Sequence, residues 1–135
     1  MDERRDVVLR SRDFVNVAMR IFLVESHPIA LACVRRHLDQ LGHEAETADT
    51  VKETLRDLPS KPRDLLIADF GLPDGDGCEL LVNLGSTRPP LAVAMSGFGS
   101  ATDRARSRNA GFQQHLTKPF LPTEFDRVLG EFQVP

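Results

Sequence analysis

The chain has 135 residues, 41% of them hydrophobic, which is enough for one well-buried core and too short for two ordinary domains. Its formal net charge of -3 gives no general attraction to nucleic acid, and no apolar run is long enough to cross a membrane. The charged first residues also lack the apolar core of a signal peptide, so we expect a cytoplasmic protein. The cysteines, Cys33 and Cys78, are too few for a disulfide framework, and we expect both to be reduced packing residues in helices.

Residues 1–19 mix charged and apolar side chains and are predicted to form an N-terminal extension or linker, in which the apolar spacing favours a short amphipathic helix. Residues 20–133 are predicted to form the folded domain, because short apolar runs alternate there with segments of helical period. In chain order, the strands are predicted at 20–24, 44–48, 65–69, 91–95 and 112–117. The helices that follow them are predicted at 28–41, 51–58, 76–84, 101–110 and 122–132.

Capping residues are expected at the starts of several of these helices. Ser26 or His27 can cap the first helix, Thr50 begins a capping box for the second, and Ser100 can cap the fourth. The fourth helix, at 101–110, has only alanines as apolar residues, so we expect it to pack lightly. Strand and helix alternate five times over short connections, which predicts a parallel sheet with helices on both faces.

Polar residues stand at the ends of four predicted strands. These residues are Glu25 with Ser26, then Asp69, Ser96 and Lys118. Open α/β sheets bind ligands at the carboxyl ends of their strands, so we expect the four ends to share one shallow site. Carboxylate, hydroxyl and ammonium groups around a divalent cation suit phosphoryl transfer, with Asp69 as the nucleophile. Ser96 would donate a hydrogen bond to one phosphoryl oxygen, and Lys118 would form an ion pair with another.

Four segments carry a resemblance to a known family. They read RIFLVESHP at 20–28, DLLIADFGLPDGDG at 64–77, AMSG at 94–97 and LTKPF at 116–120. In this order and spacing they resemble the receiver domain of two-component response regulators, over about residues 20 to 133. The resemblance implies a flavodoxin-like doubly wound (βα)5 fold, with a five-stranded parallel sheet in the order 2-1-3-4-5. It also implies a phosphoprotein of a phosphorelay, which accepts a phosphoryl group on Asp69 from a phosphohistidine.

The resemblance assigns roles residue by residue. Asp69 matches the phosphoacceptor, Ser96 the switch hydroxyl and Lys118 the lysine before a proline that is typically cis. The backbone carbonyl of Gly71 matches a metal ligand, and His115 falls at the position of the switch aromatic residue.

The first strand departs from the family pattern, because Ser26 stands where an acid normally binds the metal. The predicted metal ligands are therefore Glu25, Asp69, the Gly71 carbonyl and, weakly, Ser26. A hydroxyl is a poorer ligand than a carboxylate for a hard cation, so we expect Mg2+ to bind weakly and phosphorylation to be slow or conditional. Asp74 and Asp76 are expected to form turns and caps.

The resemblance implies a signalling domain and not an enzyme in the usual sense, with at most self-catalysed phosphotransfer and autodephosphorylation. The expected partners are a histidine kinase or a histidine phosphotransfer protein, and a downstream protein that binds the fourth helix, fifth strand and fifth helix. Arg104, Arg106 and Arg108 of that fourth helix could contact a partner, although a solvated charged face is the preferred interpretation. We expect no nucleic-acid or membrane binding, and a homodimer is compatible with the sequence.

Several alternatives stay open at this point. A pseudo-receiver of the same fold would bind partners without phosphate, an interpretation that Ser26 and His115 motivate. A flavodoxin-like cofactor protein has less support, since the chain has no Trp or Tyr to stack on a flavin and no phosphate loop after the first strand. The Asp69-Phe70-Gly71 triplet resembles a kinase motif, and Ser26, His27 and Asp69 are hydrolase residue types, but the accompanying motifs of both classes are missing. The chain could be a stand-alone receiver or part of a hybrid histidine kinase.

Overall fold

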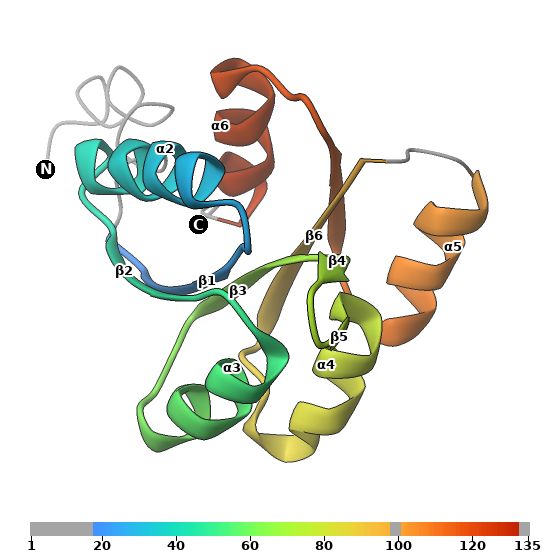
Figure 1. The fold of residues 1–135 in the computed structure, drawn as a ribbon. Helices are drawn as coiled ribbons and strands as arrows, with labels where there is room; N and C mark the ends of the chain where they lie inside the picture. Colours follow the sequence, from blue (N-terminus) through green and yellow to red (C-terminus); the bar gives the residue numbers. More distant parts are fainter. Residues whose placement is uncertain (1–17, 98–100, 133–135) are drawn as a thin grey trace, which may run out of the picture.

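The fold comes from a computed structural model that describes residues 18–97 and 101–132 (Figure 1). The helix predicted within 1–19 and the cap predicted at Ser100 lie outside the described residues. The division of the chain at residue 19 stays a prediction.

Five parallel strands form the central sheet, as the alternation of elements predicted. Their bounds are β1 Arg20–Val24, β2 Glu44–Ala48, β3 Leu65–Asp69, β6 Leu91–Ser96 and β7 Gln114–Thr117. They lie in the order β2-β1-β3-β6-β7, which is 2-1-3-4-5 when only the strands of this sheet are counted. The chain leaves β1 for one edge and then returns to β3, so the strand order reverses between these two strands.

Helices cover both faces of the sheet (Figure 1). Their bounds are α2 Pro28–Gln40, α3 Val51–Asp57, α4 Gly77–Leu84, α5 Ala101–Ala110 and α6 Pro122–Glu131. In the ribbon, α2 and α6 lie on one side of the sheet, and α3, α4 and α5 lie on the other. No helix in the described residues is both long enough and apolar enough to cross a bilayer.

The two faces of the sheet have separate hydrophobic cores. All five residues of β3 are buried, and successive side chains point to opposite faces: Leu66 and Ala68 join the core under α4, and Leu65 and Ile67 join the core under α2 and α6. A strand buried on both faces needs an unbroken apolar run, which explains why β3 was predicted at its observed bounds. The apolar run stops at Asp69, the last residue of the strand at its carboxyl end.

The structure departs from the sequence predictions at several positions. A two-residue hairpin, β4 Gly71–Leu72 and β5 Gly75–Asp76, lies in the loop after β3 and was not predicted. Strand β7 begins at Gln114 instead of residue 112. Cys78 is buried as predicted, but Cys33 is exposed on α2, so the prediction that it packs in the core was wrong. The reason is helical phase, since Leu38 is the buried residue of α2.

The acidic residues of the loop after β3 act as helix caps, as predicted. Asp76 is the N-cap of α4, and its carboxylate accepts a hydrogen bond from the Cys78 N–H. The carboxylate of Asp74 accepts hydrogen bonds from the Val51 and Lys52 N–H groups at the start of α3, and these bonds lower the pKa of Asp74. The loop is thereby joined to two helices.

Candidate functional site

The carboxyl ends of β1, β3, β6 and β7 bring together the side chains that the sequence singled out. Glu25 follows β1, Asp69 ends β3, Ser96 ends β6 and Lys118 follows β7. The strand order reverses between β1 and β3, which is where open α/β sheets bind ligands. Glu25, Asp69 and Ser96 are buried polar residues, so their positions are set by the sheet.

Lys118 connects two of the strand ends. Its ammonium donates a hydrogen bond to Asp69 Oδ2 at 2.7 Å and another to Glu25 Oε1. The side-chain exposure is 0% for Glu25, 9% for Asp69 and 25% for Lys118, so the charges interact in a largely dry environment. Burial by itself lowers the pKa of Lys118, but the hydrogen bonds and charges of Asp69 and Glu25 outweigh burial and raise it. Lys118 is therefore cationic in the folded protein at neutral pH.

The backbone after β3 is fitted closely around Asp69. The Gly71 N–H donates to Asp69 Oδ1 at 3.1 Å, which orients the carboxylate. At Gly77 a Cβ atom would lie 2.4 Å from the Asp69 backbone oxygen, too close for any side chain to be accommodated. Gly77 thus allows the start of α4 to lie directly against the end of β3.

Ser96 is held by β7 and by the ring of His115. The Ser96 carbonyl accepts a hydrogen bond from the Lys118 N–H at 2.7 Å, and its Oγ lies 2.7 Å from His115 Nε2. The His115 ring meets the ring of Phe70 edge-on, with centroids 5.4 Å apart. The predicted switch residues Ser96 and His115 are therefore in direct contact.

A cavity of 440 Å3 opens over these groups. Its lining comprises His27, Asp69, Phe70, Gly71, Asp76, Ser96, Gly97, Asp103, Arg106 and Lys118. The lining is polar and carries both signs of charge, with the Asp69 carboxylate and the Lys118 ammonium in its wall. Such a cavity can accept a small anionic group beside a nucleophilic carboxylate.

Sequence reasoning missed the role of Arg106. It was grouped with Arg104 and Arg108 as part of a solvated helix face, yet its guanidinium forms an ion pair with Asp76 and lies 5.6 Å from the centroid of the Phe70 ring. These contacts join α5 to the loop after β3. No signal in the sequence distinguishes Arg106 from the other two arginines, because the contacts depend on how α5 is placed against α4.

The predicted metal ligands are not all turned toward the cavity. Asp69 and Gly71 line it, whereas Ser26 lies half-buried in the bend after β1. Both oxygens of Glu25 have protein donors, since Oε1 accepts from Lys118 and Oε2 accepts from the His27 N–H at 3.2 Å. Among the residues that the structure describes, no cluster of three or more acidic, histidine or cysteine side chains is arranged to hold a metal ion.

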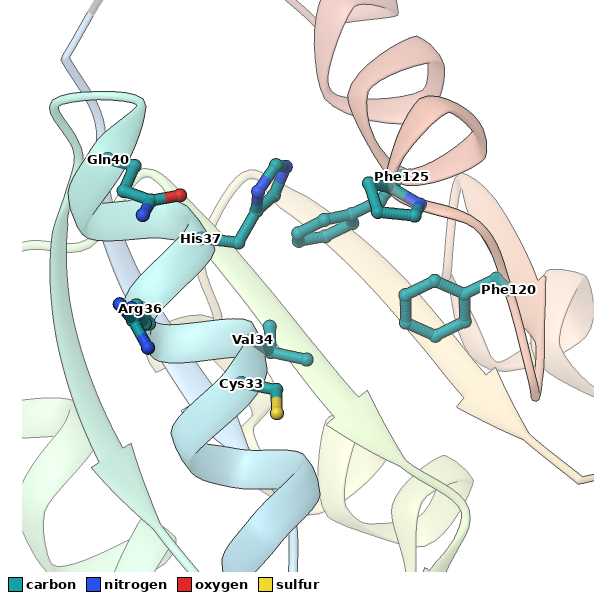
Figure 2. A pocket seen from close by; sticks show the side chains of 8 residues that line it. Cys33, Val34, Arg36, His37, Gln40, Phe120 and Phe125 are labelled. Atoms are coloured by element: carbon teal, nitrogen blue, oxygen red, sulfur yellow. The ribbon is translucent and has the colours of Figure 1, made fainter.

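Two further cavities lie between α2 and the segment from Lys118 to Phe125. One, of 330 Å3, is lined by apolar and aromatic groups together with Arg36 and Gln40, and Figure 2 shows the rings of Phe120 and Phe125 on the side opposite Val34 and His37. The neighbouring cavity, of 450 Å3, is lined by Glu25 and Lys118 as well as by residues shared with the first. Lys118 therefore borders two cavities, one on the side of α5 and one on the side of α2.

Comparison with known proteins identifies one family. The sequence model of the response regulator receiver domain family matches residues 21–129 of this chain. The transcriptional regulatory protein KdpE of Mycobacterium tuberculosis is 30% identical over 105 residues, which are 78% of this chain and 46% of KdpE. The histidine-protein kinase BarA of Shigella flexneri is 25% identical over 133 residues, which are 96% of this chain and 14% of BarA. The chain therefore spans about half the length of KdpE and a small part of BarA.

Solved structures agree on the fold. A CheY-like response regulator receiver domain protein from Methanospirillum hungatei superposes with a TM-score of 0.79 at 28% identity, covering 87% of this chain and 94% of that one. The non-phosphorylated receiver domain of HemR from Leptospira biflexa gives a TM-score of 0.74 at 27% identity, covering 82% and 94% of the two chains.

Proposed function

The chain belongs to the family of response regulator receiver domains of two-component signalling, and on that premise we propose that it is a phosphorylation-controlled switch whose acceptor is Asp69. The phosphoryl donor is a phosphohistidine of a histidine kinase or of a histidine phosphotransfer protein. The protein acts in the cytoplasm and performs no turnover on a separate substrate, beyond its own phosphorylation and dephosphorylation.

The observation that carries this proposal is the ammonium of Lys118 between the carboxylates of Glu25 and Asp69, in the wall of the cavity. Phosphorylation forms a P–O bond to Asp69 as the bond between phosphorus and the donor breaks, and the donor leaves with the electron pair. Lys118 then faces a phosphoryl oxygen in place of the carboxylate charge, and the Ser96 hydroxyl faces another. Positioning and charge neutralisation are what phosphoryl transfer requires from a protein.

We propose Mg2+ as the cofactor, bound weakly. Asp69 and Gly71 line the cavity, and a carboxylate and a backbone carbonyl are oxygen ligands of the kind that Mg2+ prefers. Glu25 is engaged by Lys118 and by the His27 N–H, and Ser26 replaces the usual second acid, so the protein supplies little of the negative charge that holds the ion. When bound, Mg2+ would neutralise charge on the transferring phosphoryl group.

The face formed by α5, β7 and α6 is the proposed surface for a downstream partner or for a second copy of the chain. Of the ten residues of α5, all of them described, Ser107 alone is buried, so this helix can shift with little loss of core packing. Two-state signalling needs such an element, since phosphorylation can only redistribute packings that differ by a few kcal/mol.

Mass spectrometry after incubation with Mg2+ and acetyl phosphate tests the proposal. We expect a gain of one phosphoryl group in the wild type and none in Asp69→Asn. Omitting Mg2+ should slow the reaction, and half-saturation should need a high Mg2+ concentration. No gain in the wild type, repeated with a phosphohistidine donor, would exclude the phosphorylated switch.

The second candidate function is a pseudo-receiver that binds its partner without phosphate. Ser26 favours it, together with the fully engaged Glu25, because both reduce the charge available to a metal ion. A partner whose affinity is the same for the wild type and for Asp69→Asn would support this candidate over the first.

A further inference from the structure

A chain of hydrogen bonds runs from α5 through His115 to Ser96. Ser107 donates its hydroxyl hydrogen to the Arg104 carbonyl at 3.0 Å, and Ser107 Oγ lies 3.1 Å from His115 Nδ1. On the other side of the ring, His115 Nε2 lies 2.7 Å from Ser96 Oγ. Both ring nitrogens are therefore engaged by hydroxyl groups on different elements.

Counting donors assigns the tautomer of His115. A hydroxyl has one hydrogen, and that of Ser107 is used on the Arg104 carbonyl, so Ser107 Oγ must accept from His115 Nδ1–H. In the neutral ring Nε2 is then the acceptor, and it takes the hydroxyl hydrogen of Ser96. Ser107 thus determines which way the Ser96 hydrogen points.

This arrangement conflicts with the role of Ser96 in a phosphorylated site. A phosphoryl oxygen is only an acceptor, so Ser96 must offer its hydrogen to that oxygen and give up its bond to neutral His115. If His115 takes up a proton on Nε2, the bond reverses: Nε2–H donates to Ser96 Oγ, and the Ser96 hydrogen is released. We propose that His115 is a positioning residue for Ser96, and that phosphorylation of Asp69 is linked to uptake of a proton by His115.

The proposed linkage rests on the proposed function, because it couples the uptake of one proton to the phosphorylation of Asp69. The proton comes from solvent and stays on Nε2, and none is transferred to the phosphoryl group. Two effects favour the protonated ring after phosphorylation: the hydrogen bond that Ser96 gains, and the attraction between the imidazolium and the added negative charge. Linkage then requires that acid favour the phosphorylated state, because that state binds one more proton.

The cavity beside Ser96, whose Oγ contacts His115, is lined by ionisable groups from β3, β5, α5 and the loops after β1 and β7. They are Asp69, Asp76, Asp103, Arg106, Lys118 and His27. Arg104 of α5 is joined to the same hydrogen-bond chain through its backbone carbonyl. Carboxyl, guanidinium and amino groups ordinarily keep their charge between pH 6 and pH 8. His27 is the other histidine of this set, so the experiment has to separate it from His115.

The tautomer is tested first, without any phosphorylation. Nitrogen NMR of the full chain labelled with 15N-histidine should show His115 at pH 8 with its hydrogen on Nδ1, and Ser107→Ala should shift it toward the form with hydrogen on Nε2. A wild-type His115 with hydrogen on Nε2 at pH 8 would overturn the inference, whatever the protein does with phosphate.

The linkage is tested by the extent of phosphorylation with acetyl phosphate and Mg2+ at pH 6 and pH 8. His115→Phe keeps the ring against Phe70 and removes both nitrogens, so effects of pH on the reagent appear equally in this variant. We expect the ratio of the extents at pH 6 and pH 8 to be at least about threefold larger in the wild type than in His115→Phe. His37→Gln, on α2, is the matched control and should behave like the wild type.

The outcomes separate the two proposals. Absence of phosphorylation at both pH values in the wild type and in His115→Phe would refute the proposed function and, with it, the linkage, while the tautomer could still be as assigned. Phosphorylation with equal pH ratios in the wild type and His115→Phe would refute the linkage alone. A pH ratio that disappears in His27→Gln and persists in His115→Phe would assign the proton to His27 and overturn the inference.

Discussion

Replacing Lys118 by methionine tests whether the ion cluster is a stabilising part of the fold. Methionine has a similar length, so the change removes the charge and leaves two carboxylates facing each other. Breaking a buried ion pair by removing one partner costs about 3–5 kcal/mol. We expect the lower end, about 3 kcal/mol, because the Lys118 side chain is 25% exposed and water can reach the remaining charges. For a domain of this size, that corresponds to a fall in Tm of roughly 10 °C.

Adding Glu25→Gln to Lys118→Met should recover most of the lost stability, because the fully buried side chain at position 25 would then be uncharged. Glu25→Gln alone should cost less than Lys118→Met, because Asp69 keeps its partner. The assay is urea unfolding followed by far-ultraviolet circular dichroism, since the chain has no tryptophan for fluorescence. A Lys118→Met protein within about 1 kcal/mol of the wild type, or a double variant less stable than the single one, would refute the reasoning.

Three other predictions can be checked with the same purified protein. Gly77→Ala places a Cβ atom 2.4 Å from the Asp69 backbone oxygen, so we expect a loss of about 1–3 kcal/mol in urea unfolding and a fall in phosphorylation. Burial lowers the pKa of His43 below its ordinary value, so the unfolded chain takes up a proton before the folded one; stability should fall as the pH drops from about 7 to 5, and this fall should be smaller in His43→Asn. Burial raises the pKa of Cys78 to about 11, so a thiol reagent should modify one cysteine of the native protein, the exposed Cys33, and both cysteines only after unfolding.

The sequence predicted those parts of the site that depend on where strands end. An apolar run followed by a polar residue is a local signal, and parallel strands place their carboxyl ends at one edge. The order of residues alone therefore led us to expect that Asp69, Ser96 and Lys118 would meet. The contact between Ser96 and His115 was not predicted, since the family resemblance only assigned each of them to a switch position.

The contacts made by α5 could not be predicted, because they depend on the rotation and position of a weakly amphipathic helix. Arg106 pairs with a residue thirty positions away, and Ser107 reaches His115 across the gap between helix and strand. Neither contact has a periodic signature. The position of Cys33 was wrong for a different reason: cysteine is usually a buried residue type, but Cys33 lies off the helix face that carries the buried Leu38.

The single buried residue of α5 has a consequence for how the domain opens. A helix that buries one serine contributes little to the free energy of global unfolding, so its amides should exchange hydrogen through local openings that leave the sheet intact. The amides of β3, buried along their whole length, should exchange only when the domain unfolds. Each opening of α5 also withdraws the Ser107 hydroxyl from His115, so the hydrogen bond that fixes the tautomer of that ring is lost in the open state. We therefore expect the tautomer preference of His115 to weaken under conditions that increase the population of open α5.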